Sequence, residues 1–371
     1  MKPPGEYLVI GLLSLFHTGF RNSNHNCFNG KPGFNPAFRP NHGPLRHGIL
    51  LELIVDTSIL DLTIIIVNWN TRQLLLDTLA SVYANPPGDP ASFEIIVVDN
   101  GSTDGSLAAV IQHFPQVRQI ANQANRGFGP ANNQGLAIAR GRYSLLLNSD
   151  VIVQPGSLAR VLGFMENNPG VGLCGIQVLN PDGSFQGSYA PYLNLWRELL
   201  VVSGVGRRLL KRPYPSYRAD QSQTTRPVQT IQGAFMFART AALREIGWLD
   251  EQFFMYGEEN DLSQRLERKG WQTYYLADTS IIHLGGQSSR KNWTKMTWQL
   301  QKSKVLLFRK YYGRRVALGF KLLISLAVLV KYGIAQAKQF GRSSLKPVIA
   351  PPGPTRQGWF SWSEFRQFWS I

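Results

Sequence analysis

Short apolar runs recur along the first half of the chain and alternate with stretches of helical pattern. Three runs are rich in Ile, Val or Leu and cover residues 62–67, 94–98 and 143–147. Helix-like stretches follow or separate them, at residues 71–84, 105–113 and 130–139. Runs of this length predict strands buried on both faces, and their alternation with helices predicts βαβ units in a mainly parallel sheet.

Two of these runs lead directly to an acid. Asp99 ends the second run, and Asp150 follows the third after Asn148 and Ser149. In an open α/β sheet the carboxyl ends of parallel strands line the ligand crevice. The pattern therefore predicts that Asp99 and Asp150 share one cleft.

Six sequence blocks between residues 62 and 289 resemble one enzyme family, in the family's order. They read TIIIVNWN, IIVVDNGSTDGS, NRGFGPANNQGLAIARGRYSLLLNSDV, GAFMFART, WLDEQFFMYGEENDLSQRLERKGW and IIHLGGQSS. This set is similar to family 2 glycosyltransferases of the GT-A fold, and most of all to bacterial rhamnosyltransferases. The resemblance implies an α/β domain over residues 61–289, with a mixed, mostly parallel central sheet flanked by helices.

The resemblance assigns donor binding to residues at strand ends and in the loops after them. These residues are Val67, Asn68, Trp69, Asp99, Arg126, Gly127, Asn133, Ser149, Asp150, Gly233 and Ala234. Asp99 would accept a hydrogen bond from the imide N–H of uracil or thymine; the structural alternative is a cap on the turn and helix that follow. Arg126 would pair with phosphate, or lie at the surface like most arginines.

The metal motif of the family is incomplete in this chain. It reads Asn148-Ser149-Asp150, so only its last acid, Asp150, is present. Mg²⁺ and Mn²⁺ commonly keep waters and substrate phosphates as ligands, so one protein carboxylate suffices when a diphosphate supplies others. The resemblance also makes His283 a metal or phosphate ligand and places Ser288 on the serine of that motif; a packed core histidine is the alternative.

Three acids at residues 258–261 resemble the Glu-Asp block of the family, at the start of a helix beneath the acceptor site. The catalytic base there is the aspartate at the second position, which is Glu259 in this chain, and glutamate can abstract the same proton. Glu258 is the competing base, and Asp261 is expected to orient the helix or the base. Acids also favour helix starts for electrostatic reasons alone.

Together these features predict an inverting, metal-dependent glycosyltransferase. It would transfer rhamnose or a hexose from dTDP-rhamnose or a UDP-hexose to a lipid-linked or polysaccharide acceptor in cell-surface glycan synthesis. Residues 190–230, rich in Arg, Tyr and Pro, are expected to form the acceptor loop. Two alternatives stay open: a catalytically silent nucleotide-sugar-binding protein, motivated by the missing acid, and a nucleotidyltransferase, disfavoured because residues 68–71 lack glycine.

The formal charge of +16 is concentrated at the C-terminal end. Residues 61–278 carry 18 basic and 19 acidic side chains, whereas residues 279–371 carry 16 and 1. Basic residues among apolar ones are attracted to anionic lipid, so residues 290–345 predict a helical membrane-associating region before a C-terminal tail at 346–371. The apolar run 316–330 is too short to span a bilayer. A helix packed on the domain is the alternative, and nucleic acid is not an expected partner because no nucleic-acid motif accompanies the charge.

The first 60 residues carry none of the catalytic blocks. They are rich in Asn, Gly and Pro up to about Gly48 and predict a disordered extension or a start placed too far upstream. Cys27 and Cys174 are the only cysteines, so a disulfide framework is not expected and a reducing cytosol fits. The predicted location is the cytoplasm, peripheral at the inner face of the plasma membrane.

Overall fold

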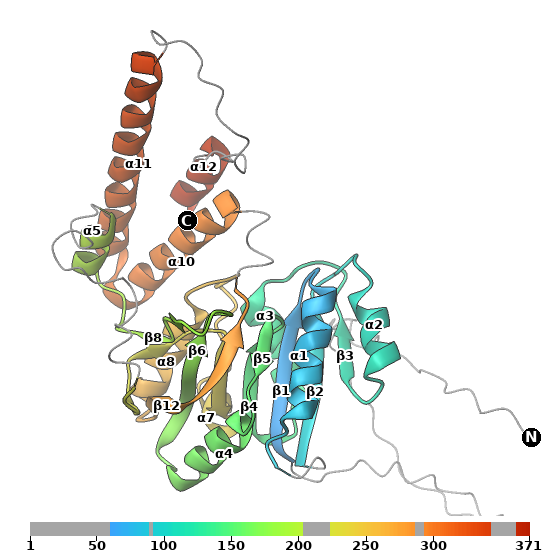
Figure 1. Cartoon of the computed structure of the whole chain (residues 1–371). Helices are drawn as coiled ribbons and strands as arrows, with labels where there is room; N and C mark the ends of the chain where they lie inside the picture. The colour runs from blue at the N-terminus through green and yellow to red at the C-terminus, as the bar shows by residue number, and fades with distance from the viewer. Residues whose placement is uncertain (1–59, 89–91, 203–222, 286–292, 343–360) are drawn as a thin grey trace, which may run out of the picture. The chain divides into compact units, whose positions relative to one another are not determined.

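A computed structural model describes residues 60–88, 92–202, 223–285, 293–342 and 361–371 (Figure 1). The predicted N-terminal extension covers residues 1–60, and of these the structure describes only Leu60. Ser288 also lies outside the described ranges, so both assignments stay predictions. The predicted domain borders at 289 and 345 also fall outside the described segments.

The N-terminal half of the sheet follows the predicted βαβ pattern. Its strands are β1 (Leu60–Asn68), β2 (Phe93–Asp99), β3 (Arg118–Ala121) and β4 (Gly141–Asn148). The connecting helices are α1 (Arg72–Ala84), α2 (Ser106–His113) and α3 (Phe128–Ala137). β1 pairs in parallel with both β2 and β4, and β2 pairs in parallel with β3. The three predicted helices are present, with α3 shifted by two residues toward the N-terminus.

The second half of the sheet adds strands of both directions. The longer strands are β6 (Val171–Leu179), β11 (Phe235–Arg239) and β12 (Gln272–His283), and the short ones are β5 (Val151–Val153), β7 (Phe185–Gln186) and β9 (Arg226–Pro227). β8 (Tyr189–Ala190) and β10 (Thr230–Ile231) pair with each other in a separate two-stranded sheet. The order is β3-β2-β1-β4-β11-β6-β12-β5, with β11 antiparallel to β4 and β6. This mixed sheet confirms the predicted fold class.

Alternate side chains of each strand build two apolar layers, one on each face of the sheet. Ile64 and Ile66 of β1 lie in a core cluster with α1, α2 and α4 (Ser157–Asn167), whereas Ile65 lies in a second cluster with α3, α7 (Thr240–Glu245) and α8 (Glu258–Arg268). Both faces are therefore covered by helices, which is why the strands read as continuous apolar runs.

The strand order reverses at β1, and this fixes the position of the crevice. β2 and β3 lie on one side of β1, and β4 lies on the other. Ligands of open α/β sheets bind outside the carboxyl ends of the strands at such a switch point. The chain segments after Asn68 and Asn148 are therefore brought together by topology alone.

The three C-terminal helices and the earlier helix α5 form a separate apolar cluster. They are α5 (Leu195–Val202), α10 (Trp293–Tyr312), α11 (Arg314–Arg342) and α12 (Trp362–Ser370). Phe308 of α10, Phe320 of α11 and Phe368 of α12 are fully buried in this cluster. The predicted helical region is thus present, and the apolar run 316–330 lies within α11. Within the described ranges, no helix combines the length and the apolar character that crossing a bilayer requires.

Candidate active site

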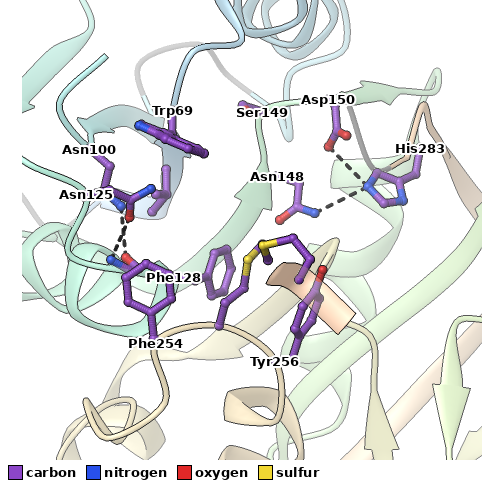
Figure 2. Close-up of a pocket in the computed structure, with 14 residues that line it drawn as sticks. Trp69, Asn100, Asn125, Phe128, Asn148, Ser149, Asp150, Phe254, Tyr256 and His283 are labelled. Atoms are coloured by element: carbon purple, nitrogen blue, oxygen red, sulfur yellow. Dashed lines mark hydrogen bonds and ion pairs between the residues drawn. The ribbon is translucent and has the colours of Figure 1, made fainter. Parts of the chain in front are cut away.

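A cavity of about 310 Å³ lies at the carboxyl ends of β1 and β4 (Figure 2). It is lined by Val67, Trp69, Asn100, Asn125, Gly127, Phe128, Asn148, Ser149, Asp150, Phe254, Met255, Tyr256, His283 and Met296. Its volume falls in the usual range for small-molecule sites, and its lining is mostly apolar with a few polar groups. The switch point of the sheet therefore holds a site of the size and character that ligand binding requires.

One end of the cavity presents aromatic and amide side chains. Figure 2 shows Trp69, Asn100 and Asn125 together at this end, with Phe254 below them. The Asn100 side chain donates to the carbonyl oxygen of Gly127 (3.0 Å) and accepts from the Asn122 amide (3.0 Å), so it is held in place. Aromatic faces with nearby amides suit a flat heteroaromatic group, since such rings stack on aromatic side chains.

A close backbone contact sets the lower wall of this end. The Phe128 N–H donates to the carbonyl oxygen of Phe254 (2.7 Å), which ties α3 to the segment before α8. Gly127 has φ +94°, and a Cβ atom there would lie 2.4 Å from the Phe254 carbonyl oxygen. Glycine is therefore required at position 127 for steric reasons.

Two cavity loops hold a non-glycine residue in the left-handed region of backbone space. These residues are Asn70 (φ 54°), which follows Trp69, and Tyr256 (φ 69°), which itself lines the cavity. Such conformations cost of order 1–3 kcal/mol each and persist where the surroundings enforce them, often at ligand clamps. The Asn70 side chain accepts from the Thr103 N–H (2.8 Å), which holds the first loop.

The other end of the cavity presents a carboxylate and an imidazole. His283 ends β12, and its backbone pairs with Val151 of β5, next to Asp150. This register places His283 Nε2 3.2 Å from Asp150 Oδ1 and 3.4 Å from the Asn148 amide nitrogen (Figure 2). On the other side of the ring, Nδ1 lies 2.6 Å from Gln186 Oε1. An oxygen can only accept, so Nδ1 carries the proton in this contact and Gln186 fixes the orientation of the ring.

The three acids of the 258–261 block start α8, directly after the cavity residues Phe254–Tyr256. Glu258 is buried, and its Oε2 has no hydrogen-bond partner in the described part of the chain. Glu259 is half-buried, and its Oε2 accepts from the Gly257 N–H (2.9 Å). Burial raises the pKa of Glu258 well above the usual value, and the Glu259 carboxylate raises it further.

Glu259 differs from its neighbour in what surrounds its carboxylate. Burial also raises the pKa of Glu259, but backbone N–H groups of Glu259 itself and Gly257 oppose that rise. Neighbouring carboxylates in unequal surroundings separate into an acid and a base. The Gly257 N–H favours the charged form of the Glu259 carboxylate, whereas the Glu259 carboxylate disfavours the charged form of Glu258, so the two carboxyls have unequal surroundings.

Asp261 is fully buried and anchors α10 to α8. Its carboxylate accepts from Arg265 Nε (2.7 Å) and the Tyr311 hydroxyl (2.6 Å), and it lies 2.5 Å from Lys310 Nζ. The Ser303 hydroxyl of α10 also donates to the Met255 carbonyl oxygen (2.8 Å). With Met296 lining the cavity, α10 is part of the site's wall. The predicted orienting role of Asp261 stays a prediction.

Asp261→Asn is expected to lower the free energy of unfolding by about 3 kcal/mol, because it removes the fully buried charge with which Arg265 and Lys310 pair. Urea denaturation at pH 7 measures this loss. Asp250→Asn is the matched control, since Asp250 also binds Lys310 (2.6 Å) but at a more exposed position. Equal losses in the two variants would contradict a network centred on Asp261.

Other predicted donor residues lie around the cavity without lining it. Asp99 is 1 % exposed, and its carboxylate accepts from the Asn68 amide (2.8 Å) and the Ser102 N–H (2.8 Å). Asn68 is also buried, so both side chains brace the turn at 100–105, while Asn100 faces the cavity. Asp99 is thus not among the residues that line the cavity, and its predicted contact with the nucleobase stays a prediction.

The remaining predicted residues have structural contacts or open surroundings. Asn133 donates to the Leu249 carbonyl oxygen (2.9 Å) and ties α3 to the loop before α8, and Arg126 is exposed. Ala234 is buried and accepts from the Asn148 N–H (3.2 Å). A Cβ atom at Gly233, two residues before β11, would meet no atom of the described residues within 4 Å. Its predicted place beside the donor sugar stays a prediction.

Sequence reasoning assigned no role to several residues that line or support the cavity. These are Asn100, Phe128, Phe254, Met255, Met296 and Gln186. Phe254 and Met255 precede the acid block by only a few residues, so the position of that block in the sequence could have indicated that they lie near the cavity. Met296 and Gln186 lie in segments with no motif, and only the tertiary structure brings them to the site.

The family model of glycosyl transferase family 2 matches residues 63–247. The match covers the switch point and most of the cavity's sequence segments. Through this domain the chain belongs to glycosyl transferase family 2 and is a glycosyltransferase.

Curated relatives point to bacterial rhamnosyltransferases. The chain is 29% identical over 211 residues to N-acetylglucosaminyl-diphospho-decaprenol L-rhamnosyltransferase of Mycobacterium tuberculosis, covering 53% of this chain and 68% of that protein. It is 24% identical over 246 residues to rhamnosyltransferase WbbL of Escherichia coli, covering 63% and 89%. The resemblance to rhamnosyltransferases that the sequence blocks predict is thereby confirmed.

Solved structures are similar at a lower level. The mannosyltransferase of Pyrobaculum calidifontis in complex with GDP-Man and Mn²⁺ superposes with a TM-score of 0.49 at 15% identity, over 77% of this chain and 76% of that one. At this level the comparison concerns the fold alone.

Proposed function

We propose that the cavity binds a nucleotide-diphospho-sugar and that the protein transfers its sugar, with inversion, to a lipid-linked or polysaccharide acceptor. The observation that carries this proposal is the chemical difference between the two ends of the cavity. Trp69, Asn100 and Asn125 at one end suit a nucleobase, and Asp150 and His283 at the other end suit a divalent cation that would bind a diphosphate.

The donor is dTDP-rhamnose or a UDP-hexose. The cavity wall includes Phe128, Phe254, Met255 and Met296, and such a wall accepts the methyl group of a 6-deoxy sugar more readily than an extra hydroxyl. The names of the similar proteins support rhamnose in the same way. A thermal-shift panel of dTDP- and UDP-sugars separates the two, because a ligand that binds only the native state raises its stability by mass action.

A divalent cation, Mg²⁺ or Mn²⁺, fits the Asp150 end. Two adjacent ligands of an octahedral ion with bonds of about 2.1 Å lie about 3.0 Å apart. The distance from Asp150 Oδ1 to His283 Nε2 is 3.2 Å, and Gln186 keeps the proton on Nδ1. Among the described residues no cluster of three or more Asp, Glu, His or Cys forms a cation site, so the diphosphate and water would complete the ligands. Such an ion supplies charge stabilisation for the leaving diphosphate.

The transfer is a single displacement. Glu259 takes the proton of an acceptor hydroxyl, whose oxygen attacks the anomeric carbon as the bond from that carbon to the diphosphate oxygen breaks. The Phe254–Tyr256 segment, which leads into α8, lies across the cavity from Ser149 and Asp150 in Figure 2. This arrangement supports an acceptor side and a leaving-group side on opposite walls.

The acceptor carries a lipid, and the protein works in peripheral contact with the inner face of the cytoplasmic membrane. Two observations support this part of the proposal. Residues 279–371 carry the excess of basic side chains, and one relative is named for a decaprenol-linked substrate.

The decisive experiment is release of nucleoside diphosphate from dTDP-rhamnose with Mn²⁺ and a synthetic N-acetylglucosaminyl-diphospho-prenol as acceptor. Product with inverted anomeric configuration is expected, and NMR of the isolated glycan measures it. Binding of the donors without any nucleotide release, across several acceptors, would favour a silent binding protein. Release of pyrophosphate would favour nucleotidyl transfer.

Gln186→Leu is expected to weaken Mn²⁺-dependent binding of dTDP or UDP by about 10- to 100-fold, the usual effect of removing the partner of a ligating histidine. Isothermal titration calorimetry measures this affinity without turnover. Gln186→Glu keeps an acceptor oxygen for Nδ1–H and is expected to retain most of the affinity. Unchanged binding in the leucine variant would show that Gln186 does not position His283.

A further inference from the structure

The helix α11 exposes an apolar face that none of the other described elements covers. Its residues, termed here the leucine face, follow helical spacing and are Leu318, Leu322, Leu326, Leu329 and Val330, each between 49% and 63% exposed. The opposite side of the same helix is buried through Ala317, Phe320 and Ile324. Exposed apolar side chains that are scattered singly over a surface are normal, whereas a contiguous exposed apolar surface of this kind marks a binding surface.

The helices α10 and α11 carry basic side chains and no acidic ones. Residues 293–342 contain eleven Lys and Arg and no Asp or Glu. Arg314 and Arg315, at the start of α11, are exposed. An apolar helix face accompanied by basic residues has the composition of helices that lie in the interface of an anionic bilayer.

The same charge pattern decides between possible occupants. A second copy docked through the same face would bring the exposed Arg314 and Arg315 of both copies together, and α10 and α11 have no acid to pair with them. Nucleic acid would satisfy the charge, but it would leave the leucines exposed to water. Only a surface that is both apolar and anionic complements the two features.

We propose that the leucine face inserts into the headgroup region of an anionic lipid bilayer, with Arg314 and Arg315 on lipid phosphates. The inference rests on the proposed function in that the bilayer would carry the lipid-linked acceptor, but the docking itself requires neither donor nor acceptor. Tryptophan favours membrane interfaces, and α5, which packs against α11, exposes Trp196 (66%) close to this helix.

Vesicle flotation of the full chain tests the docking. The probes are phosphatidylcholine vesicles with and without phosphatidylglycerol. Wild type is expected to float with the anionic vesicles and to lose binding as NaCl is raised. Leu322→Gln/Leu326→Gln is expected to reduce the bound fraction at least about tenfold, and Arg314→Gln/Arg315→Gln to remove the preference for anionic lipid. Ile111→Gln is the matched control, since Ile111 of α2 is also 61% exposed but lies away from the basic region of the sequence.

The controls separate this proposal from the function. All variants are expected to melt like wild type, because the replaced side chains are exposed, and to release nucleotide from dTDP-rhamnose normally in vesicle-free buffer. Equal flotation of wild type and the double leucine variant would overturn the docking surface. A wild-type dimer that dissociates in the leucine variant, without vesicle binding, would assign the face to a second copy. Vesicle binding by a protein that never turns over any donor would leave the docking intact and reject the proposed function.

Discussion

Replacing Glu259 by glutamine is expected to lower kcat by about 10²- to 10⁴-fold, the usual contribution of a general base. Donor affinity should change little, because Glu259 comes after the lining residues Phe254–Tyr256 in the sequence and does not line the cavity itself. Single-turnover release of nucleoside diphosphate measures the rate, and calorimetry measures donor binding. Retained turnover would contradict the assignment of the base.

The pH dependence and a neighbouring variant sharpen this test. Burial raises the pKa of Glu259, so the protonated, inactive form persists to higher pH than for an exposed glutamate. We expect kcat/KM to rise with pH through this raised pKa in wild type and to be flat there in Glu259→Gln. Glu258→Gln makes the same change one residue away and should keep most of the activity. The opposite result would move the proton-acceptor role to Glu258.

Replacing Asp150 by alanine is expected to abolish the part of donor stabilisation that depends on Mn²⁺. Turnover should fall by at least about 100-fold, since charge stabilisation by a metal ion is worth several kcal/mol. Thermal shift with dTDP or UDP, with and without Mn²⁺, measures the first effect without turnover. Saturating ligand at about 100 times its Kd should raise wild-type stability by about 2.7 kcal/mol.

Asp278→Ala provides the control for this experiment. Asp278 is exposed and paired with Arg160 at the surface (2.8 Å), so its loss should leave the Mn²⁺-dependent shift unchanged. A full Mn²⁺-dependent shift in Asp150→Ala would mean that the cation, if one binds, does not use this carboxylate.

The central sheet was predictable because its strands are buried on both faces, but that same burial hid which side chain faces the cavity. Asn68 and Asp99 are register partners at the ends of β1 and β2. Side chains alternate along a strand, so Val67 and Asn100 point to the face that carries α3, and Asn68 and Asp99 point to the other. A run that is apolar at every position gives no period from which this parity can be determined.

Contacts between segments distant in the sequence could not be predicted for a different reason. Gln186 lies on a two-residue strand, and Met296 lies on a helix whose sequence shows only charge and hydrophobicity. Their positions follow from tertiary packing over long chain separations, such as the 97 residues between Gln186 and His283. By contrast, Asp150 and His283 were predictable together because each lies in a recognisable block of the family.

The attachment of α10 has a consequence for how such proteins diverge. The helical region supplies Met296 to the cavity and Lys310 as a partner of the buried Asp261, so the region and the domain share structural contacts. A descendant that exchanged this region for another would need a new residue to close the cavity and new counter-charges under α8. Substitutions on α8 and on the face of α10 that contacts it can therefore be expected to occur together.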